Sequence, residues 1–132
     1  MSVTTFTTAL ADLVITDVVR RESVIPIDVE IADLPYQYVG QPSTDQSFKT
    51  FGRVFINPTR TSELVVLVRP VVMGTNSQNY TDVGTMANNV TTALNAAITN
   101  ASIDSYQLEL ETREINGHEY HAVVATVTGR DK

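Results

Sequence analysis

Two alternating segments on either side of an Asn-Gly pair constrain the fold more than any other feature of this sequence. Asn116-Gly117 is a favoured type I′ turn pair. A two-residue turn there pairs three apolar residues with three others: Tyr106 with Val127, Leu108 with Ala125, and Leu110 with Val123. Because the turn chemistry and the apolar pattern agree, residues 106–128 are predicted to form a β-hairpin.

Four other segments have the composition of strands. Residues 25–31 alternate between apolar and polar side chains, which predicts a half-buried strand. Residues 34–39 and 48–56 predict two more strands. Residues 63–73 contain five consecutive apolar positions, which favours a strand that is covered on both faces and central in its sheet. Pro70 marks a bend in this strand or its end.

Two segments have helical periodicity. Residues 4–20 carry apolar side chains at helical spacing, although their β-branched run at 13–19 makes a strand a competing prediction. Residues 81–99 have the clearest stripe: Val83, Met86, Ala87, Val90, Leu94, Ala97 and Ile98. The opposite face of this helix holds Asn and Thr without charge, which suits an ordinary neutral face or one covered by another surface.

These elements predict an α+β fold in one domain, residues 1–132. It has one mixed, mainly antiparallel sheet, two helices packed against it and a C-terminal β-hairpin. Residues 41–47 are predicted to be a polar loop. The chain has no cysteine, which excludes a disulfide, a thiolate metal site and a cysteine nucleophile. No signal peptide or membrane-spanning run is visible, so we expect a protein used inside the cell that makes it.

The charges are unevenly distributed along the chain. The formal net charge is −6, with acidic residues concentrated in 1–45 and 104–119 and basic residues in 46–81. The four cations of 46–81 are spread along the segment, and they would make a poor binding site for the phosphate backbone of a nucleic acid: Lys49, Arg53, Arg60 and Arg69. The pattern suits either a solvated surface or complementary patches that meet between identical copies.

Chemistry-bearing motifs are scarce. His118 and His121 are three residues apart, so on a strand they would point to opposite faces and could not share a metal. Two carboxylate pairs have strand spacing, Asp28/Glu30 and Glu109/Glu111, but their alternation with apolar residues explains both as solvent faces. No nucleophile elbow or phosphate-binding glycine motif occurs. We therefore expect no catalytic, cofactor-binding or metal-binding residues and no cofactor. A small hydrolase with a site built from dispersed Asp, His and Ser residues is the alternative, and a monomeric adaptor is a third possibility.

The order of elements resembles the tail terminator, or tail completion, proteins of long-tailed bacteriophages. Three segments carry the resemblance: Ala32-Asp-Leu-Pro-Tyr-Gln-Tyr-Val39, then Leu64–Met73 followed by the 81–99 helix, and the closing Tyr106–Thr128 hairpin. Residues 40–62 hold more strand-like sequence than this pattern places, which leaves a related neck or head–tail connector protein as an alternative.

The resemblance implies a structural virion protein that is assembled in the host cytoplasm. Such a protein forms a ring, usually a hexamer, at the head-proximal end of the tail, where it ends tube polymerisation. Its partners would be copies of itself, the tail tube protein and the head connector, and DNA would pass through its lumen without specific binding.

A closed ring needs two different patches that meet between neighbours. The charge pattern suggests candidates for the subunit interface: Lys49, Arg53 and Arg60 on one side, and Glu109, Glu111 and Glu114 on the other.

Overall fold

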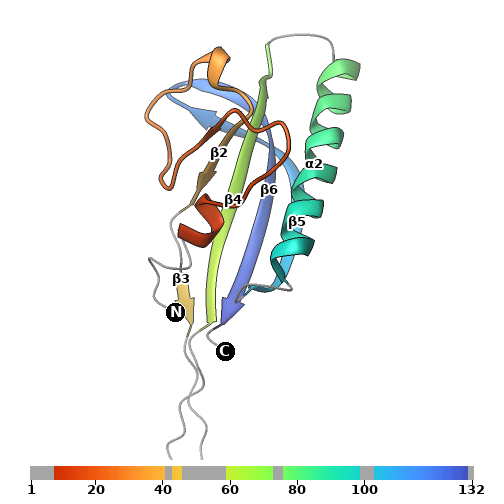
Figure 1. Cartoon of the computed structure of the whole chain (residues 1–132). Coiled ribbons are helices and arrows are strands. Elements are labelled where there is room, and N and C mark those ends of the chain that lie inside the picture. Colours follow the sequence, from red (N-terminus) through yellow and green to blue (C-terminus); the bar gives the residue numbers. More distant parts are fainter. Residues whose placement is uncertain (1–7, 41–42, 46–58, 73–75, 99–102, 131–132) are drawn as a thin grey trace, which may run out of the picture.

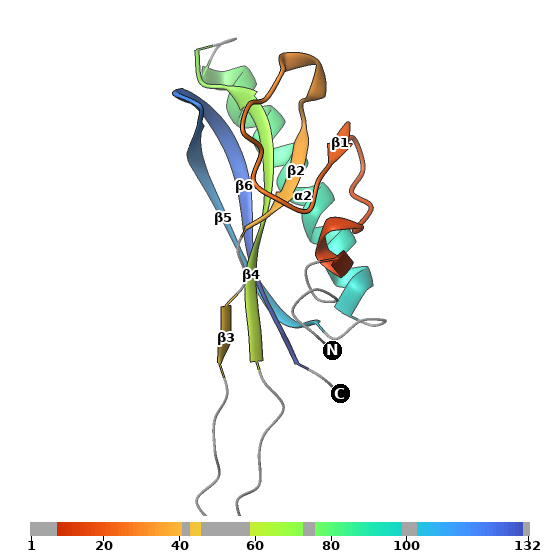
Figure 2. The same cartoon turned by 90° about the vertical axis from the view of Figure 1, so that its left-hand side faces the viewer.

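A single sheet organises the chain, with helical residues on one face and an irregular segment on the other (Figures 1 and 2). The computed structural model describes residues 8–40, 43–45, 59–72, 76–98 and 103–130. In the described part the strands have the order β1-β2-β4-β6-β5, and β3 also pairs with β4. The fold is α+β with a mixed, mainly antiparallel sheet, two helices and a C-terminal hairpin, as the sequence predicts. The strands are β1 (Arg20–Arg21), β2 (Tyr36–Val39), β3 (Ser43–Asp45), β4 (Thr59–Pro70), β5 (Ile103–Ile115) and β6 (His118–Arg130). The helical elements are residues 8–11, the short 3-10 helix η1 (Ile31–Asp33) and α2 (Asn76–Ile98).

The C-terminal hairpin is confirmed in its predicted register. β5 and β6 pair Tyr106 with Val127, Leu108 with Ala125 and Leu110 with Val123. Asn116 and Gly117 both have positive φ, at 51° and 80°, which a type I′ turn requires. The like-charged pair Glu114 and Glu119 lies opposite across the strands next to this turn.

β4 is the central strand that the apolar run predicts. It pairs with β6 along one edge, and with β2 and β3 along the other. Its residues 64–68 are all buried, alternately in the two core clusters on opposite faces of the sheet. The strand ends at Pro70, which has no N–H for a ladder hydrogen bond.

α2 covers one face of the sheet, which we call the helix face (Figure 1). Four residues of its predicted stripe are fully or almost fully buried: Val83, Met86, Val90 and Leu94. The Asn and Thr residues of its opposite face, Thr85, Asn88, Thr92 and Asn95, are exposed. The helix begins five residues before the predicted start, at Asn76.

The predicted N-terminal helix, residues 4–20, is confirmed only at residues 8–11 and is wrong beyond them, while residues 4–7 lie outside the described residues. Residues 8–11 are helical, but residues 13–15 and 18–19 have no regular structure, so the competing strand at 13–19 is wrong too. The side-chain amide of Gln37, which is fully buried in β2, explains where the helix ends. Its Nε2 lies 3.2 Å, 3.4 Å and 3.1 Å from the carbonyl oxygens of Leu10, Ala11 and Leu13. These contacts add a donor for carbonyls at the C-terminal end of the helix and just beyond it, where intrahelical partners are missing; the Leu10 carbonyl also accepts from the Leu13 N–H at 3.3 Å.

The predicted strand at 25–31 is also wrong. The chain is irregular there and ends in η1, and of the four alternating apolar residues only Val29 is buried. The cause is competition for the sheet edge. Val19 and Glu22 donate backbone hydrogen bonds of 2.9 Å to the carbonyls of Pro35 and Gln37, so the β1 segment occupies the place beside β2. Residues 25–31 instead cover the second face of the sheet, opposite the helix face (Figure 2).

The remaining predictions are partly tested. The strand at 34–39 is confirmed as β2, whereas the predicted loop at 41–47 contains β3, which pairs with Thr59–Thr61. The predicted strand at 48–56 lies outside the described residues. Among the described residues, no helix combines the length and the apolar character that a bilayer crossing requires.

Replacing Gln37 by leucine should lower the free energy of unfolding by about 1–3 kcal/mol, because the Ala11 carbonyl loses the Gln37 amide as its donor and the Leu10 and Leu13 carbonyls each lose one of two. The matched control is Gln107→Leu, an exposed glutamine on β5, for which we expect a change within about 0.5 kcal/mol. Urea unfolding of both variants measures the difference. Equal losses would show that the amide of Gln37 contributes nothing specific.

Candidate interaction surfaces

The described residues do not bring metal-binding groups together. They contain no cluster of three or more His, Asp or Glu side chains that could hold a metal ion. His118 and His121 lie on opposite faces of β6, as their spacing predicts, because His118 is opposite Ile115 and His121 is opposite Thr112. The His121 ring packs edge-to-face against Tyr80, with ring centroids 6.1 Å apart. This contact gives His121 a packing role at the side of α2.

The two carboxylate pairs differ from each other. Asp28 and Glu30 are not on a strand, and one Asp28 oxygen accepts a 2.9 Å hydrogen bond from the Val29 N–H. Glu109 and Glu111 do share one face of β5, since they are opposite Val124 and Ala122. Only Glu111 of these two has an ion pair among the described residues, and its partner is Arg113.

Arg113 connects β5 to β4 on the second face. Its guanidinium lies 2.6 Å from a Glu111 oxygen and 2.8 Å from a Glu63 oxygen. Burial raises the pKa of the neighbouring Tyr38 phenol above its ordinary value of 10.0, and the carboxylates of Glu63 and Glu111 raise it further while Arg113 opposes them. This network is a structural tie between strands, because its cation is shared by two carboxylates within the chain.

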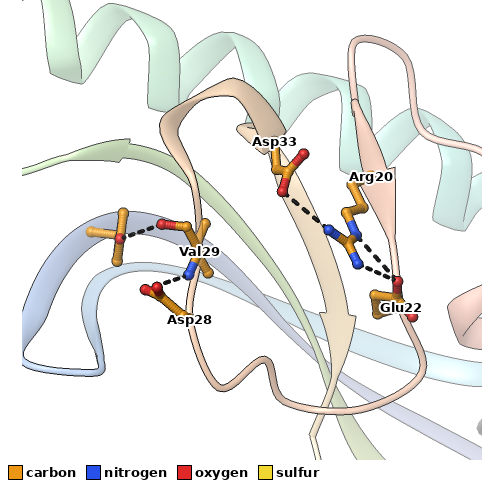
Figure 3. Close-up of polar contacts among 6 residues, drawn as sticks. Arg20, Glu22, Asp28, Val29 and Asp33 are labelled. Atoms are coloured by element: carbon orange, nitrogen blue, oxygen red, sulfur yellow. Dashed lines mark hydrogen bonds and ion pairs between the residues drawn. The ribbon is translucent and has the colours of Figure 1, made fainter.

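A second ionic cluster fixes β1 beside η1 (Figure 3). Arg20 donates to Glu22 at 3.1 Å and to Asp33 at 3.1 Å, and its guanidinium lies 5.6 Å from the centroid of the Tyr36 ring. Its side chain is half exposed, so these contacts contribute little to stability. They do fix the direction of the guanidinium, which lies on the second face of the sheet with Tyr36.

The predicted interface residues are placed only in part. Lys49 and Arg53 lie outside the described residues. Arg60 is on β4, opposite Thr44 on one side and Gly129 on the other. The three glutamates lie along β5, with Glu109 and Glu111 on the second face and Glu114 on the helix face. The structure therefore brings the acidic set to one edge strand.

The loop surface is the first exposed apolar region that sequence reasoning missed. We define it as Val24, Ile25, Ile27 and Ile31, together with Val72 beyond the end of β4. All five are more than half exposed, Ile27 at 91% and Val72 at 92%. Ile31 and Val72 line a hollow of about 490 Å³ with the hairpin residues 117–120. The alternation of apolar residues in 25–31 is the sequence feature that could have indicated this surface. Such alternation, however, predicts burial within the same chain.

The β5 edge surface is the second. Among the described strands, β5 pairs only with β6, so its other edge is open along the strand. Leu110, at the middle of β5, is 57% exposed, and Tyr80 of α2 is 69% exposed. Both line a hollow of about 360 Å³ with Val83 and His121. An open edge of this length presents backbone N–H and C=O groups that another strand can pair with.

Raising the pH should destabilise the fold in a way that depends on Tyr38. Its pKa is raised in the folded chain, so the stabilisation is complete below pH 10.0 and is lost as the pH rises through the higher folded value. Tyr38→Phe removes this titration, and the variant should lose less unfolding free energy between neutral and strongly alkaline pH. Urea unfolding over a pH series, with phenolate absorbance as a second readout, measures it. The same alkaline loss in both proteins would contradict the assignment.

Comparison with known proteins adds no relative to this picture. No protein-family model matches the sequence, and no curated protein matches it either. Function is therefore inferred from the residues themselves.

Proposed function

We propose that this chain is a structural virion protein that forms a ring at the head-proximal end of a phage tail. In this role it ends tube polymerisation and joins the tail to the head connector. Its partners are further copies of itself, the tail tube protein and the connector, while DNA passes through the lumen without specific binding. The net charge of −6 suits a lumen that should not retain a polyanion.

The loop surface is the observation that carries this proposal. A large apolar side chain that remains in water adds nothing to the hydrophobic stabilisation of its own chain, whereas burial against a partner contributes roughly 25 cal/mol per Å². Single exposed apolar residues are ordinary, but Val24, Ile25 and Ile27 are nearly consecutive, and Ile31 and Val72 line one hollow. Such a surface favours a protein that works by contact with other proteins.

The order of elements supports the choice of this class. Helical residues 8–11, strand β2, the buried strand β4, helix α2 and the β5–β6 hairpin follow one another along the chain. This is the succession that the resemblance to tail terminator proteins implies. The two outer strands of the described sheet, β1 and β5, are also different from each other, and a closed ring needs two different patches on each subunit.

Replacing Ile27 by glutamate should abolish ring formation. The side chain is 91% exposed, so the free energy of unfolding should change by less than about 0.5 kcal/mol. Burying a new carboxylate in an apolar contact between proteins should nevertheless prevent assembly. Mass measurement in solution and negative-stain imaging follow the rings, and thermal unfolding follows the fold.

The matched control is Ala9→Glu, which adds the same charge at an exposed apolar position in the first helical turn. This variant should assemble like the unaltered chain. Rings formed by Ile27→Glu would remove the loop surface from the proposal. An unaltered chain that stays monomeric at every concentration and also in the presence of tail tubes would overturn the proposal itself.

A further inference from the structure

The two outer strands of the sheet, β1 and β5, run in opposite directions and carry opposite charges. We propose that β1 of one copy pairs antiparallel with β5 of the next, so that the sheets of the ring join edge to edge. This inference rests on the proposed ring and names the contact that closes it. Its occupant is a second copy of this chain.

Strand directions allow this pairing. β1 is parallel to β2, and β2, β4, β6 and β5 then alternate in direction, so β1 and β5 run in opposite directions within one copy. A ring axis that runs along the strands leaves strand directions unchanged. The β1 of a neighbour placed beside β5 is therefore antiparallel to it, which is the more stable of the two arrangements.

The open side of β1 has backbone groups available for a ladder. Glu22 N–H bonds the Gln37 carbonyl at 2.9 Å, and Arg20 N–H points to the Pro35 carbonyl at 3.5 Å. Backbone groups of consecutive residues in a strand point to alternate sides, so those of Arg21 face away from β2. On the other partner, the outer edge of β5 pairs with none of the strands that the structure describes.

The registers within the sheet bring opposite charges to the same level. Arg20, Tyr36, Leu67, Ala122 and Glu111 form one row across the five strands. Without stagger between copies, Arg20 of one copy lies opposite Glu111 of the next. A stagger of two residues, which keeps every side chain on its face, brings Arg20 opposite Glu109 instead. Arg20 and both glutamates lie on the second face, so either register places a carboxylate of the next copy beside this half-exposed cation, which Glu22 and Asp33 of its own copy also contact.

The side chains of β1 and β5 on the helix face also suit this pairing. Arg21 follows Arg20 in β1, is exposed and lies on the opposite face of the strand, where its Nε donates to the Leu13 carbonyl at 3.2 Å. In the unstaggered register it lies opposite Leu110, which is exposed on the same face beside Tyr80. The aliphatic stem of Arg21 therefore meets Leu110 on one face while Arg20 meets a glutamate on the other.

Self-pairing of β5 is the competing arrangement, and its charges disfavour it. Two β5 strands would bring Glu109, Glu111 and Glu114 of both copies to one seam. The single cation of this strand, Arg113, is already bound to Glu63 and Glu111. Like charges along adjacent strands are destabilising. The edges thus favour a head-to-tail contact, which is the kind that closes a ring.

Engineered disulfides test this contact cleanly, because the chain contains no cysteine. The pair Arg21→Cys/Leu110→Cys reports the unstaggered register, and Arg21→Cys/Leu108→Cys reports the staggered one. Within one copy four strand spacings separate these positions, roughly 19 Å, which is far beyond the ~7 Å limit between the Cα atoms of a disulfide. Every bond formed therefore joins two copies.

Mild oxidation of one of the two pairs should convert most of the monomer band on a non-reducing gel into a ladder that ends at the ring's copy number. Reductant should restore the monomer. The matched control is Arg21→Cys/Thr126→Cys, whose second cysteine is on the interior strand β6 and should give no ladder. An unchanged melting temperature shows that each reduced variant is folded.

The two proposals fail in different ways. Rings seen by imaging without a ladder from either edge pair would overturn the edge pairing and leave the ring in place. A monomeric unaltered chain without any ladder would overturn both. A ladder from the Thr126 control equal to that of the edge pairs would mean random collision, and would also overturn the edge pairing.

Discussion

The antiparallel ladder between β4 and β6 is the interaction on which the other elements depend. Both strands are buried on both faces in their middle parts, where Leu64–Val68 lie beside Ala122–Ala125. Backbone groups at such positions have no access to water, so they must be paired within the sheet. This requirement places β5 on one side of the ladder and β2 with β3 on the other. Every exposed surface discussed above is then either a covering layer on one face or an outer edge.

The parts of the fold that local sequence encodes could be predicted, and those that depend on distant competition could not. Asn116-Gly117 fixes a turn between its own neighbours, and the stripe on α2 needs only one apolar face to pack against. By contrast, residues 25–31 have a sound strand pattern but lose the place beside β2 to the β1 segment. The first helix ends where Gln37, distant along the chain, contacts its last carbonyls. Neither outcome can be predicted from the residues of the segment itself.

The candidate interaction surfaces, too, could be predicted only where local sequence determines them. The spacing of Glu109, Glu111 and Glu114 shows that they belong to one strand, but only the sheet order shows that this strand is an edge. Glu111 also proves to be bound by Arg113, so its charge is partly used inside the chain. The exposure of Leu110 and Ile27 could not be predicted, because their alternating patterns indicate burial without saying whether the same chain supplies it.

Charged edges and apolar surfaces make different contributions to an assembly. In the proposed seam, an exposed ion pair of Arg20 with Glu109 or Glu111 would contribute about 0–1 kcal/mol, too little to hold two copies together. Its value lies in discrimination, since it favours the β1–β5 seam over a β5–β5 seam that would collect carboxylates. Affinity has to come from apolar area, which the loop surface and the Leu110 side chain offer. In the proposed ring, neither contribution is large within one contact. A closed ring repeats the contact at every seam and leaves no edge open, so the complete assembly gains stability that its intermediates lack.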